Sequence, residues 1–412
     1  MYDYIDRDMV RSIQSNLKSF PIILISGARQ VGKSTLAVKQ LEAYNYISLD
    51  RPENYNKAVE NPEKFINDLK RPVIIDEIQK ATEILPMIKY VVDKEKMDGI
   101  YGTFVLTGSA NVIMMKKISE TLAGRVALIE LLPFSQREIF RKTPFSIDLL
   151  QNSPLDLPLN RDISTDEIEK AVIIGGYPER YRMRDDTQAQ NLWTQSYLFS
   201  YIERDALDIN GIRNLDAFRR LYSLLSVQSG DIFEKQNLAV DSKLSIPTLT
   251  TYLELLQQIY QISLLPSWSS NMSKRFIKSP KIFLNDSGIM CYLRGIDSLE
   301  KLKTSELRGN IMETFVLSEL KKAVKTQHLQ KLFYYMRTSD KKEIDFIIEG
   351  GERPLAIEVK ASKTVDFSDF KHISFLQKEK PKMNFQGIIF YMGKEIVPFG
   401  ENLTAVPFSA LF

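Results

Sequence analysis

The sequence contains two groups of residues whose types and spacing could carry chemistry, and the first lies near its start. A short loop follows the apolar run Ile22–Ile25 and leads into a helix-prone segment. Its letters fit G-x-x-x-x-G-K-[ST], in which backbone N–H groups turn inward on phosphates, a lysine reaches the β- and γ-phosphates, and a hydroxyl ligates Mg²⁺. The alternative is an ordinary glycine-rich turn, but such a turn would not need both glycines, the lysine and the hydroxyl residue of the motif. We therefore expect the whole loop to bind ATP, with Lys33 catalytic and Ser34 on Mg²⁺: Gly27, Ala28, Arg29, Gln30, Val31, Gly32, Lys33, Ser34 and Thr35.

An acid pair further along the chain could complete this site. The apolar run Val73–Ile75 is followed directly by Asp76 and Glu77. In phosphoryl transfer, one acid at such a position holds the hydrated Mg²⁺ and a second polarises the attacking water. We expect Asp76 to be the metal-binding acid and Glu77 to be the catalytic base.

Two more polar positions could touch the γ-phosphate. The β-prone run Thr103–Leu106 ends in Thr107 and Ser109, whose hydroxyls could contact the phosphate or the water; a plain turn is the alternative. Arg125 precedes the run Val126–Leu131 and could neutralise the γ-phosphate, as arginines do in phosphoryl transfer. The alternative for Arg125 is a solvated arginine at the end of a loop.

The second group of chemical residues lies near the end of the chain. Glu358 and Lys360 are two positions apart, so they point to the same side of a strand. Asp345 on a neighbouring strand and Glu313 on a preceding helix could reach that side. We expect Glu313, Asp345 and Glu358 to bind a metal, and Asp345, Glu358 and Lys360 to act in nuclease chemistry. The alternative is a fold that persists as a binding module without activity.

The first group requires a sheet that brings strand ends together. Five apolar runs alternate with helix-prone segments, which predicts a parallel α/β sheet with helices on both faces. In proteins with an acid pair after the third strand, the fourth strand is commonly inserted beside the first. The expected strands are 22–26, 46–49, 72–75, 103–106 and 126–131.

The second group requires a mixed α/β unit. An amphipathic segment is followed by three β-prone runs, a helical segment and one more strand, which is the core order of the PD-(D/E)xK nuclease fold. The expected helices are 310–325 and 367–378, and the expected strands are 332–336, 343–348, 355–360 and 387–391.

The middle of the chain resembles a winged helix. Helices are expected at 218–227, 233–238 and 245–260, followed by wing strands at 262–265 and 281–284. The third helix holds no Lys or Arg between Ile246 and Tyr260, whereas a helix in the major groove usually needs cations. The basic residues lie in the wing, which could contact DNA or pack against other domains: Lys274, Arg275, Lys278 and Lys281.

Composition sets the outer limits. Of the 412 residues, 44% are hydrophobic and 26% are charged, which is typical of a globular protein. The net charge of +3 is too small to indicate nucleic-acid binding by itself. We expect a cytoplasmic protein with no membrane partner. The sequence has a single cysteine, Cys291, and it shows neither a signal peptide nor a run of ~18 apolar residues. The expected domains are an ATPase core at 1–132, a helical lid at 133–205, a winged-helix-like domain at 206–300 and a nuclease-like domain at 301–412.

Taken together, these segments resemble the bacterial and archaeal P-loop ATPases of the AAA type that carry a C-terminal domain of unknown function related to restriction-type nucleases. The matching motifs are 27–35, Ile74-Ile-Asp-Glu-Ile-Gln79, Leu106-Thr-Gly-Ser109, Leu122-Ala-Gly-Arg125, Gly175-Gly-Tyr-Pro-Glu179, Tyr201-Ile-Glu-Arg-Asp205, Glu343-Ile-Asp-Phe346 and Ile357-Glu-Val-Lys-Ala361. The resemblance implies an ATP- and Mg²⁺-dependent cytoplasmic protein. Arg204 would be an interdomain ion-pair residue or an arginine finger.

Two functions follow as hypotheses. The first is Mg²⁺-dependent ATP hydrolysis coupled to DNA handling through the C-terminal domain. The second is a slow nucleotide switch whose C-terminal domain is catalytically inactive and holds a protein partner, or a second copy of the chain.

Overall fold

The N-terminal lobe is built on a parallel sheet of five strands in the order β2-β3-β4-β1-β5. This computed structural model describes residues 4–108, 117–118, 120–202, 214–271, 275 and 278–412. The strands are β1 Ile22–Ser26, β2 Asn45–Ser48, β3 Val73–Asp76, β4 Phe104–Thr107 and β5 Val126–Glu130. The expected parallel sheet, with its fourth strand beside the first, is confirmed.

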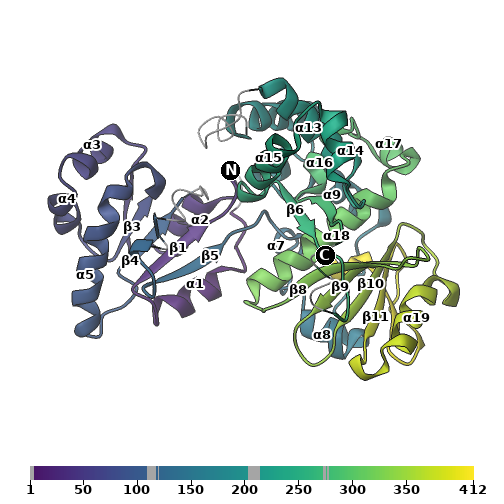
Figure 1. The fold of residues 1–412 in the computed structure, drawn as a ribbon. Coiled ribbons are helices and arrows are strands. Elements are labelled where there is room, and N and C mark those ends of the chain that lie inside the picture. The colour runs from purple at the N-terminus through teal and green to yellow at the C-terminus, as the bar shows by residue number, and fades with distance from the viewer. Residues whose placement is uncertain (1–3, 109–116, 119, 203–213, 272–274, 276–277) are drawn as a thin grey trace.

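Helices cover both faces of this sheet because its strands are apolar on both sides. Alternate residues of the strands feed two separate cores: Ile23 and Ile25 belong to one, Ile22 and Leu24 to the other. The helices of the lobe are α1 Val10–Leu17, α2 Lys33–Gln40, α3 Pro52–Glu60, α4 Pro62–Asp68 and α5 Leu85–Met97. Figure 1 shows them around the sheet.

Residues 133–202 contain helices as expected, and these helices contact two different neighbours. Their helices are α7 Gln136–Ile139, α8 Ile147–Asn152, α9 Thr165–Ile174, α10 Pro178–Arg182 and α11 Thr187–Tyr197. Gln151 on α8 donates hydrogen bonds to the carbonyls of Gly350 and Arg353 in the C-terminal part of the chain. Helix α9 instead packs on α16 Ser287–Leu293, where the Ser287 hydroxyl donates to the Val172 carbonyl at 2.7 Å. The segment expected to be one lid thus contacts both the C-terminal part of the chain and α16.

The middle unit continues with three helices and a two-stranded antiparallel ladder, the element order expected of a winged helix. It contains α13 Leu215–Val227, α14 Lys235–Ser242, α15 Ile246–Gln258, β6 Ile262–Leu265, β7 Lys281–Leu284 and α17 Leu299–Thr304. Helix α15 begins where the Ser245 side chain accepts a hydrogen bond from the Thr248 N–H. We call residues 262–284 the wing.

The C-terminal unit is a six-stranded mixed sheet in the order β12-β13-β11-β10-β9-β8. Its elements are α18 Arg308–Thr326, β8 Leu332–Arg337, β9 Glu343–Glu349, β10 Leu355–Lys360, α19 Lys371–Glu379, β11 Gln386–Tyr391, β12 Val397–Gly400 and β13 Leu403–Pro407. The expected helices and strands are present. Strands β12 and β13 were not expected.

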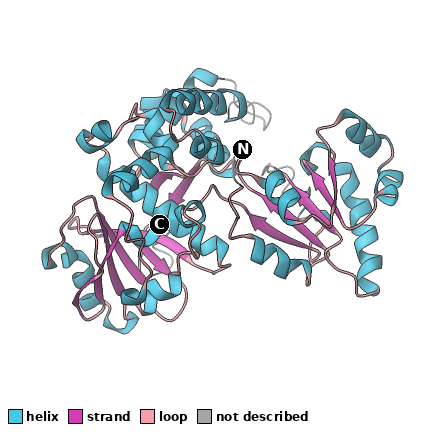
Figure 2. Ribbon diagram, turned by 180° about the vertical axis from the view of Figure 1, so that it is seen from behind, coloured by secondary structure: helices cyan, strands magenta, loops and turns pink. Residues whose placement is uncertain are grey.

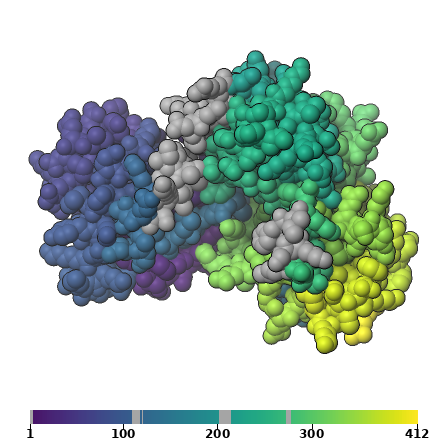
Figure 3. Space-filling model, viewed as in Figure 1, coloured from purple at the N-terminus to yellow at the C-terminus, as the bar shows by residue number. Residues whose placement is uncertain are grey.

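The N-terminal lobe stands apart from the other two units, which pack together (Figure 1, Figure 3). Seen from behind, the two larger sheets lie on opposite sides of the molecule (Figure 2). Polar contacts join the lobe to the rest: the Tyr260 hydroxyl lies 2.8 Å from that of Ser26, and Lys325 lies 2.5 Å from Glu130. Within the described residues, no helix combines the length and the apolar character needed to cross a membrane.

Candidate functional site

The phosphate loop connects β1 to α2 in a conformation that needs its glycines. Gly27 has φ +148°, and a Cβ there would fall 2.2 Å from the backbone oxygen of Leu131. Gly32, which precedes α2, has φ +95°, a left-handed value that favours glycine. The loop therefore keeps its backbone close to the end of β5 and opens directly into a helix N-terminus, which favours a bound anion.

Lys33 is buried and folds back on its own loop. Its ammonium donates to the carbonyls of Gly27 at 3.1 Å and Ala28 at 2.7 Å. These carbonyls hold the charge of Lys33 inside the loop, where arriving phosphate oxygens could take their place as stronger acceptors.

The carboxylate of Asp76 is the point on which the site converges. Only 5% of Asp76 is exposed, and its Oδ1 accepts hydrogen bonds from the hydroxyls of Ser34, at 2.7 Å, and of Thr107. Its Oδ2 accepts from the Tyr46 hydroxyl at 2.7 Å. The strand ends meet because β2, β3, β4 and β1 are neighbours in register, with Ser48 opposite Asp76 and Ile25 opposite Thr107.

This arrangement fits Mg²⁺. A carboxylate and a hydroxyl oxygen 2.7 Å apart, beside a loop that can cradle phosphates, offer the hard oxygen ligands that Mg²⁺ prefers. Ser34 and Asp76 therefore come together as the sequence predicted, and Thr107 joins them.

Glu77 sits beside Asp76 in a left-handed backbone conformation with φ +59° and ψ +45°. Its carboxylate accepts a hydrogen bond from the Gln79 amide. Burial raises the pKa of Glu77, and the neighbouring charge of Asp76 raises it further. A carboxyl whose pKa is raised is a stronger base once ionised, which suits the role expected of Glu77.

The role expected of Arg125 is wrong within this chain. Arg125 precedes β5, whose first residue pairs with Ile22 at the start of β1, whereas the phosphate loop follows the opposite end of β1. Its guanidinium donates to both carboxylate oxygens of Asp93 on α5, at 2.5 and 2.8 Å. Arg125 is therefore a pairing residue at the far edge of the sheet. Ser109 and Arg204 lie outside the described residues.

Three side chains near the loop were not expected from the sequence. Arg7 donates to the Val31 carbonyl of the loop at 2.9 Å and to the Leu132 carbonyl at 2.6 Å. Tyr46 contacts Asp76, and Tyr260 reaches Ser26 at the end of β1. Only Tyr46 could have been found from the sequence, because it belongs to the strand beside the strand that carries Asp76. The positions of Arg7 and Tyr260 depend on contacts between distant segments.

The second group of residues is also brought together, and a lysine lies beside two of its acids. Glu313 lies on α18, Asp345 on β9, and Glu358 and Lys360 on β10. Among the described residues, no three His, Cys, Asp or Glu side chains are arranged to hold a metal ion. The metal-binding role expected of Glu313, Asp345 and Glu358 stays a prediction.

The lysine beside these acids comes from another unit. The Lys281 ammonium, at the start of β7, lies 2.6 Å from Glu343, 3.7 Å from Glu313 and 3.9 Å from Asp345. Lys360 lies at the border of this group: its charge opposes the rise that burial causes in the pKa values of Glu358 and Asp345, and its ammonium also lies 3.9 Å from Asp369. The catalytic role expected of Lys360 beside Asp345 and Glu358 stays a prediction.

Burial governs the acids around Lys281. It raises the pKa values of Glu313 and Glu358 well above the ordinary range, and it raises that of Asp345 against the opposing charge of Lys281. Burial alone would lower the pKa of Lys281, but the carboxylates of Glu313, Asp345 and Glu343 outweigh it and raise that pKa. The ammonium of Lys281 is therefore the charged member of the cluster. The buried carboxyl groups, whose pKa values are raised, hold their protons more strongly than ordinary carboxyl groups do.

The cations of the wing point toward the C-terminal unit. Arg275 donates to both carboxylate oxygens of Glu349, at 2.5 and 2.9 Å, and Lys278 donates to the Arg337 carbonyl at 3.1 Å. With Lys281, the described basic residues of the wing all contact that unit; Lys274 lies outside the described residues. Of the two uses weighed for the wing, packing against another domain fits these contacts.

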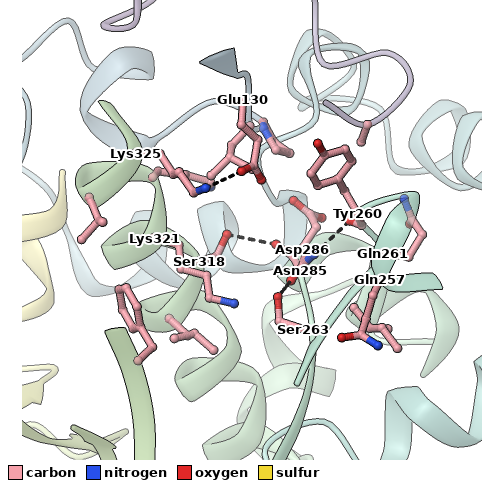
Figure 4. Close-up of a pocket in the computed structure, with 18 of the residues that line it drawn as sticks. Glu130, Gln257, Tyr260, Gln261, Ser263, Asn285, Asp286, Ser318, Lys321 and Lys325 are labelled. Carbon is pink, nitrogen blue, oxygen red and sulfur yellow. Dashed lines mark hydrogen bonds and ion pairs between the residues drawn. The ribbon is translucent and has the colours of Figure 1, made fainter. Parts of the chain in front are cut away.

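A cavity of about 960 Å³ lies where the three units meet. Figure 4 shows Lys325 paired with Glu130 on one wall, and Asn285 bonded to Tyr260, Ser263 and Ser318 on another. Lys321 on α18 also lines it, and burial lowers the pKa of this lysine to about 8. Ala28 is the residue of the phosphate loop that reaches this space.

Comparisons with known proteins match three parts of the chain to family profiles. Residues 19–140 match the family profile of an AAA domain, and residues 165–300 and 308–411 match two domains of unknown function, DUF8612 and DUF4143. The chain therefore contains an AAA-type P-loop ATPase domain, followed by a helical middle region and a mixed-sheet C-terminal domain. The profile boundary at 165 falls within the helices that the sequence assigned to a lid.

The relatives extend over most of the chain. An uncharacterised protein of Mycobacterium tuberculosis is 27% identical over 404 residues, which is 97% of this chain and 83% of the relative. An uncharacterised protein of Methanocaldococcus jannaschii is 25% identical over 364 residues, 84% of this chain and 76% of the relative. A solved Walker-type ATPase of Pyrococcus abyssi is similar over 71% of this chain and 96% of its own, at 18% identity and a TM-score of 0.44.

Proposed function

We propose that this protein binds ATP with Mg²⁺ at the phosphate loop and hydrolyses it. The observation that carries the proposal is the convergence of the Ser34 and Thr107 hydroxyls on Asp76, directly beside a loop with left-handed glycine geometry. Mg²⁺, held by Ser34 and through water by Asp76, would neutralise charge on the β- and γ-phosphates.

Each side chain then has a distinct task. Lys33 would exchange the carbonyls of Gly27 and Ala28 for phosphate oxygens and stay close to the transferring group. Thr107 and Tyr46 orient the Asp76 carboxylate through their hydroxyls. Glu77, next in the chain, would orient the attacking water and accept its proton.

A pair of variants tests this assignment. Lys33→Ala should lower ATP turnover at least ~100-fold, because it removes a positive charge from the transition state. Arg125→Ala is the matched control, since it removes a cation of the same lobe at the opposite edge of the sheet. Turnover is measured as phosphate release, and nucleotide affinity with a fluorescent ATP analogue. Loss of turnover in Arg125→Ala with none in Lys33→Ala would contradict the proposal.

A second candidate function concerns the C-terminal unit. We propose that this unit acts as a catalytically inactive module that holds a protein partner, while the ATPase site serves as a slow switch. The position of Lys281 among the acids favours this over DNA cleavage. The inward-facing cations of the wing add support, because DNA contact needs free cations.

DNA cleavage assays distinguish an inactive C-terminal module from a nuclease. Plasmid and linear DNA are incubated with the protein and Mg²⁺ or Mn²⁺, with and without ATP. The expected result is no cleavage in any combination. Cleavage that disappears in both Glu358→Ala and Lys360→Ala would overturn the inactive module and restore a nuclease coupled to ATP.

A further inference from the structure

The acidic pocket of the C-terminal unit draws its carboxyl groups from three elements. Glu313 comes from α18, Glu343 and Asp345 from β9, and Glu358 from β10. Oε2 of Glu313 and Oε1 of Glu358 are buried and have no hydrogen-bond partner among the described residues. Such oxygens are costly to bury unless a positive charge lies nearby.

The positive charge 3.7 Å from Oε2 of Glu313 belongs to the middle unit, whereas Oε1 of Glu358 lies 3.8 Å from Nδ1 of His372 on α19. Lys281 has only 3% of its side chain exposed, and its ammonium lies within 4 Å of a carboxylate oxygen on Glu313, Glu343 and Asp345. The backbone of Lys281 is fixed on both sides, by Leu265 in the wing ladder and by a bridge to Ile232. A side chain leaving so constrained a backbone enters the pocket in one defined direction.

The ammonium and a divalent metal compete for the same oxygens in this space. Mg²⁺ or Mn²⁺ would need oxygens from these same carboxylates at about 2.0–2.2 Å. An ammonium that stays within 4 Å of those oxygens would then lie a few ångströms from a double positive charge in a poorly solvated pocket. The repulsion and the shortage of free oxygens both weaken metal binding.

The wing is docked in a way that keeps Lys281 in place. Tyr335 on β8 donates its N–H to the Pro266 carbonyl at 3.1 Å and accepts from the Trp268 N–H at 2.5 Å, so the wing extends the edge of the C-terminal sheet. The indole of Trp268 and the guanidinium of Arg275 both donate to Glu349. Lys281 can leave the pocket only if this segment leaves the edge of the sheet.

We infer that Lys281 is the resident cation of this acidic pocket, and that the docked wing thereby keeps a divalent metal out of the C-terminal unit. This inference is independent of ATP hydrolysis, because it involves no residue of the phosphate loop.

Mn²⁺ binding to the full-length protein tests the inference without any activity assay. Bound Mn²⁺ is counted by electron paramagnetic resonance without nucleotide, in the wild type, Glu313→Gln, Lys281→Met, the double variant, and Lys278→Met as a control for loss of a wing lysine. Wild type and Glu313→Gln should bind equally. Lys281→Met should gain one site, at least ~10-fold tighter than any in the wild type, and the double variant should lose it; Lys278→Met should gain none.

Two results would overturn the inference: a Mn²⁺ site in the wild type that Glu313→Gln removes, or a folded Lys281→Met protein that gains no site. Circular dichroism and gel filtration establish folding. If Lys281→Met does not fold, Lys281→Gln takes its place, since an amide can still donate to the acids without the charge. The comparison of Mn²⁺ binding between the wild type and Glu313→Gln tests the inference without either variant of Lys281.

Discussion

At the scale of single residues, Asp76 organises the candidate ATPase site. Three hydroxyls, from Ser34, Thr107 and Tyr46, donate to its two carboxylate oxygens. Such a carboxylate is oriented before any ligand arrives, so little rearrangement is needed when a metal binds. The neighbouring Glu77 is set apart by its left-handed backbone and its raised pKa, which separates its role from that of Asp76.

The first prediction concerns Glu77. Glu77→Gln keeps the shape of the side chain but removes the base, so turnover should fall ~100- to 10,000-fold while ATP affinity changes little. Phosphate release and binding of a fluorescent ATP analogue measure the two quantities. Asp93→Asn, an acid at the opposite edge of the sheet, is the control and should keep its turnover. Wild-type turnover in Glu77→Gln would remove Glu77 from the mechanism.

The second prediction concerns Lys321 and pH. Its folded pKa of about 8 lies below the ordinary value near 10.4, so the unfolded chain binds more protons between these values, and the free energy of unfolding rises with pH across that window. Lys321→Met removes this penalty. The melting temperature of the variant should therefore exceed that of the wild type by about 2 °C or more at pH 7.

The pH course of that difference is the discriminating measurement. Scanning calorimetry at intervals from pH 7 to pH 10 should show the gap between Lys321→Met and the wild type shrinking above pH 8. A difference in melting temperature that stays constant across this range would mean that Lys321→Met acts through packing rather than through charge. Lys325→Met, which breaks the pair with Glu130, should instead lower the melting temperature.

At the scale of elements, the wing behaves as an extension of the C-terminal sheet. Its residues 266–268 bond to the edge strand β8, and an edge strand covered in this way is protected from pairing with other chains. Arg275 secures the contact, since it is nearly buried, donates twice to Glu349 and lies over the Tyr334 ring at 4.7 Å. The expected wing strands are confirmed, but their surroundings differ from those of a free DNA-binding wing.

The third prediction tests this docking. Arg275→Met breaks a nearly buried ion pair and leaves the Glu349 carboxylate without its charge partner, which should cost about 3 kcal/mol. Hydrogen exchange at 266–268 and in β8 should accelerate, and proteolysis within the wing should become faster. Lys80→Met, which removes an exposed pair with Asp50, is the control and should change neither. Unchanged exchange in Arg275→Met would show that the backbone contacts alone hold the wing.

At the scale of the whole molecule, one ladder runs between the two candidate sites. Tyr260 contacts Ser26, the last residue of β1 before the phosphate loop, and β6 begins two positions later. Strand β6 pairs with β7, whose first residue, Lys281, enters the acidic pocket. The two sites are thus physically continuous, and energetic coupling along this ladder is a hypothesis that needs its own measurement.

The fourth prediction addresses that coupling. Tyr260→Phe removes the hydroxyl that meets Ser26 and keeps the ring. A non-hydrolysable ATP analogue should change hydrogen exchange at 260–265 in the wild type, and this change should be at least halved in the variant. Tyr44→Phe is the matched control, because the Tyr44 hydroxyl bonds to the Gly102 carbonyl within the N-terminal lobe. An equal nucleotide response in Tyr260→Phe and the wild type would refute coupling through this contact.

Features that depend on neighbours along the chain could be predicted from the sequence. The phosphate loop, the acids at the end of β3 and the strands of both sheets are written in short patterns of glycine, apolar runs and charged ends. Because parallel strands end at a common edge, the order of the strands is enough to bring Ser34, Asp76 and Thr107 together. Glu313, Asp345 and Glu358 could likewise be assigned to one pocket from the order of their elements.

The contents of each pocket and the partner of each cation depend instead on how distant segments pack. Arg125 stands at the wrong end of its strand for catalysis, and Lys281 fills the pocket that was expected to hold a metal. Arg7 and Tyr260 reach the phosphate loop from segments that carry no motif. The physical reason is the same in each case: a long charged or polar side chain pairs with whatever the packing of distant segments places within reach, and no local pattern records that partner.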